Sequence, residues 1–191
     1  MAGDRLMDHA MHVAAILRND AFRWHLLGVV AELDLPDCWI AAGFVRNAVW
    51  DSLHKRSESP VLGDVDVVWF DRNCSDPARD RAIEHTLHTT EPTIDWSVKN
   101  QARMHIRNGD APYQSATDAM RHWPETATAV AAKRVCSDEC EIASPLGLDD
   151  LIGLVLRPTI KFTVQKRSIF EERVRSKAWR RKWPMLKCEA S

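Results

Sequence analysis

The sequence lacks three features that would each assign it to a special class of protein. It has no run approaching the roughly 18 apolar residues that a membrane span requires. Its start, MAGDRLMDHAMHVAAIL, has an early Asp and no small-residue cleavage site after an apolar stretch, so we expect no secretory signal. It has no excess of one charge, because 26 Lys and Arg stand against 27 Asp and Glu. We therefore expect a cytoplasmic protein with no membrane partner, in which any site for a polyanion is local.

Paired cysteines are also missing. The five cysteines, an odd number, contain no Cys-x-x-Cys pair; they are Cys38, Cys74, Cys136, Cys140 and Cys188. A disulfide framework or a structural zinc site would need such pairs, so we expect reduced thiols. Tyrosine occurs once against eight tryptophans, a composition that predicts a core rich in Trp.

The 191 residues, of which 45% are hydrophobic, fit a single domain spanning 1–191. Apolar spacing predicts an N-terminal helical layer over 1–34, a sheet region over 35–145 and C-terminal helices over 146–191. In the first part we expect helices over 5–30 with a break at Asn19-Asp20. In the sheet region we expect a short strand ending at Gly43, a helix over 44–53, a strand over 64–70, a helix from Asp76-Pro77 to about His88, a strand over 93–101, a short helix before Trp123 and a hairpin over 127–144. In the last part we expect a helix from Leu148 to near Pro158 and a helical basic tail over 161–187.

An acidic pair stands at the start of the strand over 64–70. Alternate side chains of a strand share a face, so Asp64 and Asp66 point one way while Val65 and Val67 enter the core. Like charges this close raise each other's pKa unless a cation lies between them, and Mg²⁺ or Mn²⁺ is the cation that such oxygens suit. The alternative is that Asp64 belongs to a turn and Asp66 lies on the surface of an edge strand.

A second acidic strand supports the metal interpretation. Alternation in 94–101 places Asp95, Ser97, Lys99 and Gln101 on one face, and Ile94, Trp96 and Val98 on the other. If the two strands are neighbours, Asp95 can bind a second metal ion or accept a proton, and Lys99 can meet a phosphate oxygen. The alternative for Lys99 is a solvated charge. Trp96 is assigned to the core, and His105 is set aside as structural or solvent-exposed.

A glycine turn supplies the remaining part of the expected site. A strand that ends at Gly43 and leads into a helix places backbone N–H groups and the positive helix end where a phosphate can approach. Arg46 and Asn47 in the first turn of this helix can contact phosphate or sugar, although Arg46 can instead pair with a nearby carboxylate.

These residues carry a resemblance to a known superfamily. The segments AGFVRN (42–47) and DVDV (64–67) resemble the helix turn and the acidic pair of the DNA polymerase beta-like nucleotidyltransferases. A closer resemblance, from about Trp39 to the Trp-Pro near the end, is to a bacterial family of small nucleotidyltransferase-like proteins. It is carried by the segments WIAAGFVRNAVWD, DVDVVWFD, WSVKNQARMH, RNGDAPY, AMRHWPETATAVA and GLDDL.

The resemblance implies an α+β fold, with a mixed sheet flanked by helices and helical additions at both ends. It also implies transfer of a nucleoside monophosphate from a nucleoside triphosphate, assisted by Mg²⁺ or Mn²⁺. In that reading Asp64, Asp66 and Asp95 are the metal ligands and Gly43 is the phosphate-approach residue. The acceptor is a small molecule, a protein side chain or an RNA end.

One departure from the superfamily favours an alternative function. The superfamily usually has Gly-Gly or Gly-Ser where this chain has Gly43-Phe44, and Phe44 offers neither a hydroxyl nor a bare backbone to a triphosphate. The alternative is a non-catalytic nucleotide- or metal-binding module on the same fold. A third interpretation, an RNA-binding adaptor using the basic tail, is weakened by Glu171-Glu172 within that tail.

Overall fold

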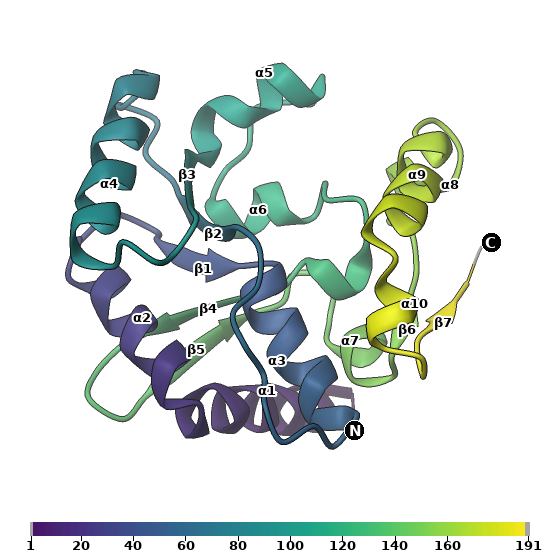
Figure 1. Cartoon of the computed structure of the whole chain (residues 1–191). Helices are drawn as coiled ribbons and strands as arrows, with labels where there is room; N and C mark the ends of the chain where they lie inside the picture. Colours follow the sequence, from purple (N-terminus) through teal and green to yellow (C-terminus); the bar gives the residue numbers. More distant parts are fainter. Residues whose placement is uncertain (1, 190–191) are drawn as a thin grey trace.

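The computed structural model describes residues 2–189 and begins with two helices packed against a sheet (Figure 1). Helix α1 spans Ala2–Asn19 and α2 spans Ala21–Ala31. Asp20 separates them because its carboxylate caps α2, accepting a hydrogen bond from the backbone N–H of Arg23. The expected break at Asn19-Asp20 is therefore confirmed.

Five short strands form the main sheet in the order β3-β2-β1-β4-β5. Their bounds are β1 Trp39–Ala41, β2 Val65–Trp69, β3 Trp96–Asn100, β4 Ala131–Arg134 and β5 Cys140–Ala143. The β2–β3 pair is parallel, whereas β1–β2, β1–β4 and β4–β5 are antiparallel. The sheet is thus mixed, as expected, and β4 and β5 form the expected hairpin. The extended stretch expected from Ala127 begins later, because Thr126–Thr128 form a 3-10 turn before β4.

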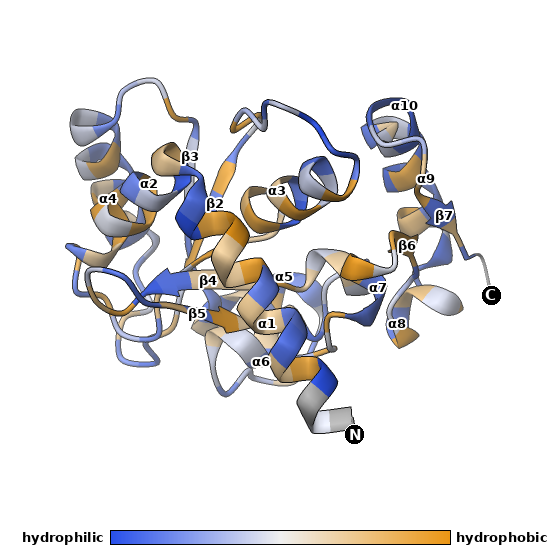
Figure 2. Ribbon diagram, turned by 90° about the horizontal axis from the view of Figure 1, so that it is seen from below, coloured by the Kyte–Doolittle hydropathy of each residue, from blue (hydrophilic) through white to orange (hydrophobic). Residues whose placement is uncertain are grey.

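One face of the sheet carries the larger core. Apolar side chains from alternate positions of β1, β2 and β3, such as Ile40, Val67 and Val98, are fully buried there. Helices α1, α2, α3 (Gly43–Leu53) and α4 (Pro77–Thr90) cover this face. Figure 2 shows apolar and hydrophilic segments alternating along α1 and α3, as expected for helices with one buried side.

The opposite face of the sheet is covered over only part of its length. Helix α6, Ala116–Met120, packs on Trp39, Ala41 and Val68 and makes a second, smaller core. The segment that leads to α6 contains a 3-10 turn, Gln101–Arg103, and helix α5, Met104–Asn108. Because α6 is short, the polar start of β2 on this face remains uncovered by it.

The C-terminal region departs from the expected pattern. The helix expected from Leu148 to near Pro158 ends at Ile152, so α7 is only Asp149–Ile152. Strand β6, Val155–Leu156, follows and pairs in parallel with β7, Lys187–Cys188. The tail is three helices and a strand instead of one helix, with α8 at Ile160–Thr163, α9 at Arg167–Lys177 and α10 at Trp179–Lys182. Pairing with a strand more than 30 residues later is a tertiary constraint that local spacing does not reveal.

A tryptophan cluster fastens the C-terminal region to α3. The ring of Trp50 in α3 meets the rings of Trp179 and Trp183 edge to face, at centroid distances of 6.2 and 5.1 Å. Trp183 Nε1 donates a 2.7 Å hydrogen bond to the buried carboxylate of Asp51, which also accepts one from Ser59 Oγ at 2.8 Å. In Figure 1 the C-terminal elements accordingly lie together beside α3 and away from β3.

None of the helices described over 2–189 has the length and apolar character to cross a membrane.

The Trp183–Asp51 bond predicts a measurable loss of stability. Trp183→Phe removes the donor and leaves the buried carboxylate short of one hydrogen bond, which costs about 1–3 kcal/mol of unfolding free energy. Urea unfolding of the variant measures this loss. Trp24→Phe, at a partly exposed site, is the matched control and should cost less; equal losses in the two variants would contradict the assignment.

Candidate functional site

The acidic pair lies at the start of β2, on the face that α6 leaves uncovered. Val65 and Val67 are buried in the main core, so the expected alternation is confirmed, with Asp66 on the opposite face and Asp64 just before the strand. In the sheet Asp66 lies between Ala41 of β1 and Ser97 of β3. Its neighbours are therefore small, which leaves open space over the carboxylate.

A cleft of about 620 Å³ opens above Asp66. Its walls come from the sheet, from the segment 101–108, from the residues after α6 and from the C-terminal helices. The polar residues of its lining include Asp66, Ser97, Lys99, Gln101, His122, Thr128, Lys166 and Arg173. This volume lies within the range of pockets that hold small molecules and cofactors.

Burial and the neighbouring charge make Asp66 a weaker acid than an ordinary Asp. Its pKa is raised to about 6, first by burial and then by the negative charge of Asp64. Three cations, Arg46, Lys177 and Arg173, act in the opposite direction. Since these cations do not restore the usual pKa, a further positive charge beside the pair would be favourable.

The third expected carboxylate stands apart from the cleft. Asp95 is exposed, precedes β3 and does not line the cleft, while its backbone carbonyl accepts a hydrogen bond from the N–H of Val65. The residue opposite Asp66 in the register is Ser97. Among the side chains that the structure describes, no three His, Cys, Asp or Glu groups gather closely enough to hold a metal ion. Asp64 is also exposed and outside the lining of the cleft, so ligand roles for Asp64 and Asp95 both stay predictions.

The glycine turn leads into a helix whose first N–H groups have no side-chain cap. Ala42 adopts φ 54° and ψ −119° at the N-cap of α3, and its side chain makes no hydrogen bond there. Ala42 lines the cleft together with Asp66. The uncapped backbone donors at this end of α3 are thus near Asp66, and the role of Gly43 in phosphate approach stays a prediction.

Phe44 does not obstruct the cleft. Its side chain is 2% exposed, belongs to the main core and lies under the guanidinium of Arg23, 5.6 Å from the ring centroid. Arg23 Nε also donates a hydrogen bond to the backbone carbonyl of Phe44. Phe44 withholds a hydroxyl from the turn, but its ring is directed away from the space that a ligand would use.

Arg46 and Asn47 are buried and bound to protein groups. Arg46 donates hydrogen bonds to Thr128 Oγ1 at 3.0 Å and to Asn47 Oδ1 at 2.9 Å. Its guanidinium lies between the rings of Trp50 and Trp179, 4.9 and 4.8 Å from their centroids. Burial lowers its pKa to about 10, so it stays charged at neutral pH and acts on Asp66 through space. Direct contact of either residue with phosphate or sugar stays a prediction.

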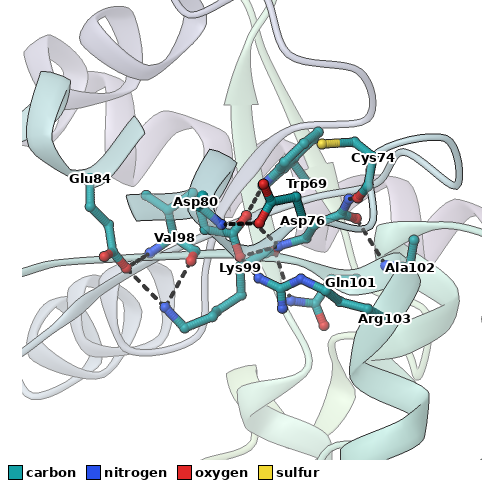
Figure 3. Close-up of polar contacts among 12 residues, drawn as sticks. Trp69, Cys74, Asp76, Asp80, Glu84, Val98, Lys99, Gln101, Ala102 and Arg103 are labelled. Carbon is teal, nitrogen blue, oxygen red and sulfur yellow. Dashed lines mark hydrogen bonds and ion pairs between the residues drawn. The ribbon is translucent and has the colours of Figure 1, made fainter. Parts of the chain in front are cut away.

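Lys99 and Gln101 line the cleft, but both have protein partners. The Lys99 ammonium points toward Glu84 of α4, at 2.9 Å, and also donates to the backbone carbonyl of Val98 (Figure 3). Gln101 Nε2 donates to the carbonyl of Lys99. For Lys99 to bind a phosphate, it would have to exchange Glu84 for the ligand.

A buried carboxylate fixes the end of β3 next to these residues. Asp80 accepts hydrogen bonds from Trp69 Nε1 and the Asn100 backbone N–H, and it forms an ion pair with Arg103 (Figure 3). This network positions the 3-10 turn that begins at Gln101. Asn100 and Arg103, two members of the polar stretch WSVKNQARMH, therefore have a structural role through their bonds to Asp80.

Helix α9 contributes cations that the sequence analysis did not single out. Arg173 lines the cleft and forms an ion pair with Glu125, whose side chain is fully buried, through a 2.7 Å bond from Nε. Burial acts to lower the pKa of Arg173, but the bond to Glu125 and the charges of Asp66 and Asp64 raise it above the usual value. In the sequence Arg173 is one of many basic residues in the tail, and no sequence pattern relates it to Asp66.

The donor set fits a divalent cation bound partly by substrate. Two carboxylates, one with a raised pKa, supply oxygen ligands and negative charge. Mg²⁺ commonly takes one or two protein carboxylates and completes its shell with water and phosphate oxygens. A metal ion brought in with a nucleotide therefore suits this pair better than an ion held by protein alone.

Comparisons with known proteins agree with this geometry. Residues 28–188 match the model of a family described as Nucleotidyltransferase. A solved structure whose description says that it reveals a CCA-adding enzyme head domain is 32% identical to this chain, with a TM-score of 0.79. The match covers 92% of this chain and 95% of that one. No curated protein matches the chain significantly. The expected α+β fold with a mixed sheet is confirmed.

The raised pKa of Asp66 predicts how stability varies with pH. The folded state binds the proton more tightly than the unfolded state, so this carboxyl costs stability as pH rises from about 4 through 6. In metal-free buffer, Asp66→Asn should be more stable than wild type at pH 8, by up to about 3 kcal/mol, and equal to it near pH 4. Urea unfolding at both pH values measures the difference. A variant less stable than wild type at pH 8 would refute this.

The register opposite Asp66 predicts the effect of a third carboxylate. Ser97→Asp places one beside Asp66 on the same face, and the added ligand charge should tighten Mn²⁺ binding about tenfold. Electron paramagnetic resonance measures free Mn²⁺ during the titration. Ser97→Ala is the control and should leave the Mn²⁺ affinity nearly unchanged. Unchanged affinity in Ser97→Asp would show that the side chain at position 97 does not lie beside the bound metal ion.

Proposed function

The chain belongs to the nucleotidyltransferase family, and on that premise we propose that it transfers a nucleoside monophosphate from a nucleoside triphosphate to an acceptor, with Mg²⁺ or Mn²⁺. The observation that carries the proposal is Asp66, a carboxylate with a raised pKa that lines a cleft beside an uncapped helix start and feels the charge of the exposed Asp64. The acceptor is a small molecule, a protein side chain or an RNA end.

In this proposal the carboxylate pair has the role of a metal ligand. Asp64 and Asp66 would hold the cation through their oxygens, while Asp95 would join them only if the segment before β3 moved toward the cleft. The bound cation would neutralise charge on the phosphate oxygens and orient the α-phosphate for in-line attack. The raised pKa of Asp66 supports this role, because coordination would relieve the repulsion between the two acids.

The phosphate groups need positive charge, and the cleft provides it from two sides. The backbone N–H groups at the start of α3, next to Gly43, face the region of the acidic pair. Arg173 and Lys166 line the opposite side. These groups bind and orient the triphosphate through charge-assisted hydrogen bonds, and they stabilise the pyrophosphate as it leaves. Gln101, also in the lining, is available to the nucleoside.

The position of Asp95 favours a second candidate function, a non-catalytic nucleotide- or metal-binding module. Ser97 lies opposite Asp66, and Asp64 and Asp95 both lie outside the lining, so Asp66 is the one acid among the described residues that line the cleft. Calorimetry with ATP, GTP, CTP and UTP, with and without Mg²⁺, separates the two candidates when it is combined with a pyrophosphate assay. Binding without release of pyrophosphate would favour the module.

Substitution of Asp66 tests the transferase directly. Asp66→Asn removes the charge that holds the cation and should reduce Mg²⁺-dependent pyrophosphate release at least about 100-fold. Asp8→Asn, at an exposed carboxylate on α1, is the matched control and should leave the rate unchanged. Turnover in Asp66→Asn equal to that of wild type would refute the assignment.

A further inference from the structure

The cleft above Asp66 has a further wall that holds a histidine. His122 follows α6 and lines the same cleft as Asp66 and Arg173. Its Nδ1 lies 3.7 Å from Asp110 Oδ2, an ion-pair distance longer than a hydrogen bond. Its ring also lies against that of Tyr113, with centroids 5.0 Å apart and planes inclined by 35°. Nε2 is therefore the ring nitrogen that Asp110 does not engage.

Asp110 is itself held firmly as a carboxylate. Its side chain is 6% exposed, and it accepts a 2.5 Å hydrogen bond from the Tyr113 hydroxyl and forms an ion pair with Lys161 of α8. Burial acts to raise the pKa of Asp110, but the bonds from Lys161 and Tyr113 outweigh burial and hold the pKa below its usual value. This fixed carboxylate lies on the Nδ1 side of the His122 ring, so Nε2 is the ring nitrogen left for a ligand in the cleft.

Few groups in the cleft can accept a proton. Among the described residues that line it, the lysines and arginines are hydrogen-bond donors, and the amides and hydroxyls are poor bases. Asp66 and His122 remain, and Asp66 is assigned to the cation. Asp95, the carboxylate expected to take a proton, is exposed and lies outside the lining.

We propose that His122 is the general base that takes the proton of the acceptor hydroxyl. The inference rests on the proposed nucleotidyl transfer. The hydroxyl oxygen forms a bond to the α-phosphorus as its proton passes to His122 Nε2. The bond from the α-phosphorus to the bridging oxygen breaks, its electron pair leaves with pyrophosphate, and Nε2 later returns the proton to water. Acceptors that arrive already ionised, such as a phosphate or a carboxylate, would need no such base.

A comparison of two nucleophiles tests this role. Wild type and His122→Gln are incubated with ATP and Mg²⁺, with glycerol as the hydroxyl probe or with labelled inorganic phosphate as the ionised probe. Transfer to glycerol gives glyceryl-AMP, and transfer to phosphate gives labelled ADP; both release pyrophosphate. His122→Gln should lower transfer to glycerol at least about 100-fold and leave transfer to phosphate within about threefold of wild type.

His105→Gln is the matched control. His105 lies close by, with its ring 6.1 Å from that of Tyr113, but its Nδ1 is hydrogen-bonded to the Ala102 carbonyl, and it does not line the cleft. This variant should change neither reaction. Equal losses with both nucleophiles in His122→Gln would assign His122 to binding or folding and overturn the proposal, as would an undiminished glycerol reaction. Absence of both products with wild type would instead contradict the nucleotidyl transfer itself, and the inference with it.

Discussion

The half-buried carboxylate of Asp66 is the constraint on which the arrangement of the other charged groups depends. A carboxylate with an acidic neighbour and little water is costly unless positive charge surrounds it. The chain brings that charge from distant segments, Arg46 from α3 and Arg173 and Lys177 from α9. These cations leave the pKa of Asp66 near 6, so the fold itself does not fully stabilise the ionised carboxylate. In the proposed reaction a divalent cation would supply the missing positive charge.

The interactions that stabilise the C-terminal region also complete the cleft. Trp179 and Trp183 pack against Trp50, and the buried carboxylates of Asp51 and Glu125 accept hydrogen bonds from Trp183 and Arg173, in the last third of the chain. Through these contacts α9 is placed with Arg173 across the cleft from the acidic pair. Three of the eight tryptophans therefore dock this region, and stability and site assembly depend on the same residues.

The sequence predicted those features that local pattern determines. Alternation along β2 and β3 gave the faces of Asp66 and Ser97, and the Asp20 cap gave the boundary between the first two helices. Sequence-based prediction failed where the interacting segments are distant in the chain. Strand β6 forms by pairing with β7, and tertiary packing brings the charge of Arg173 to Asp66. Asp95 illustrates the same limit, since sharing a face with Ser97 did not establish that it reaches the cleft. No sequence pattern marked His122 as a functional residue, because its position beside Asp110 is set by the tertiary structure.

A crystal structure with Mn²⁺ and a non-hydrolysable nucleoside triphosphate would show whether Asp64 and Asp66 bind a divalent cation together with a nucleotide. We expect an anomalous peak about 2.1 Å from oxygens of both carboxylates, with triphosphate oxygens completing the coordination. A nucleotide bound in the cleft with no peak beside these two residues, or with Mn²⁺ held elsewhere, would contradict it.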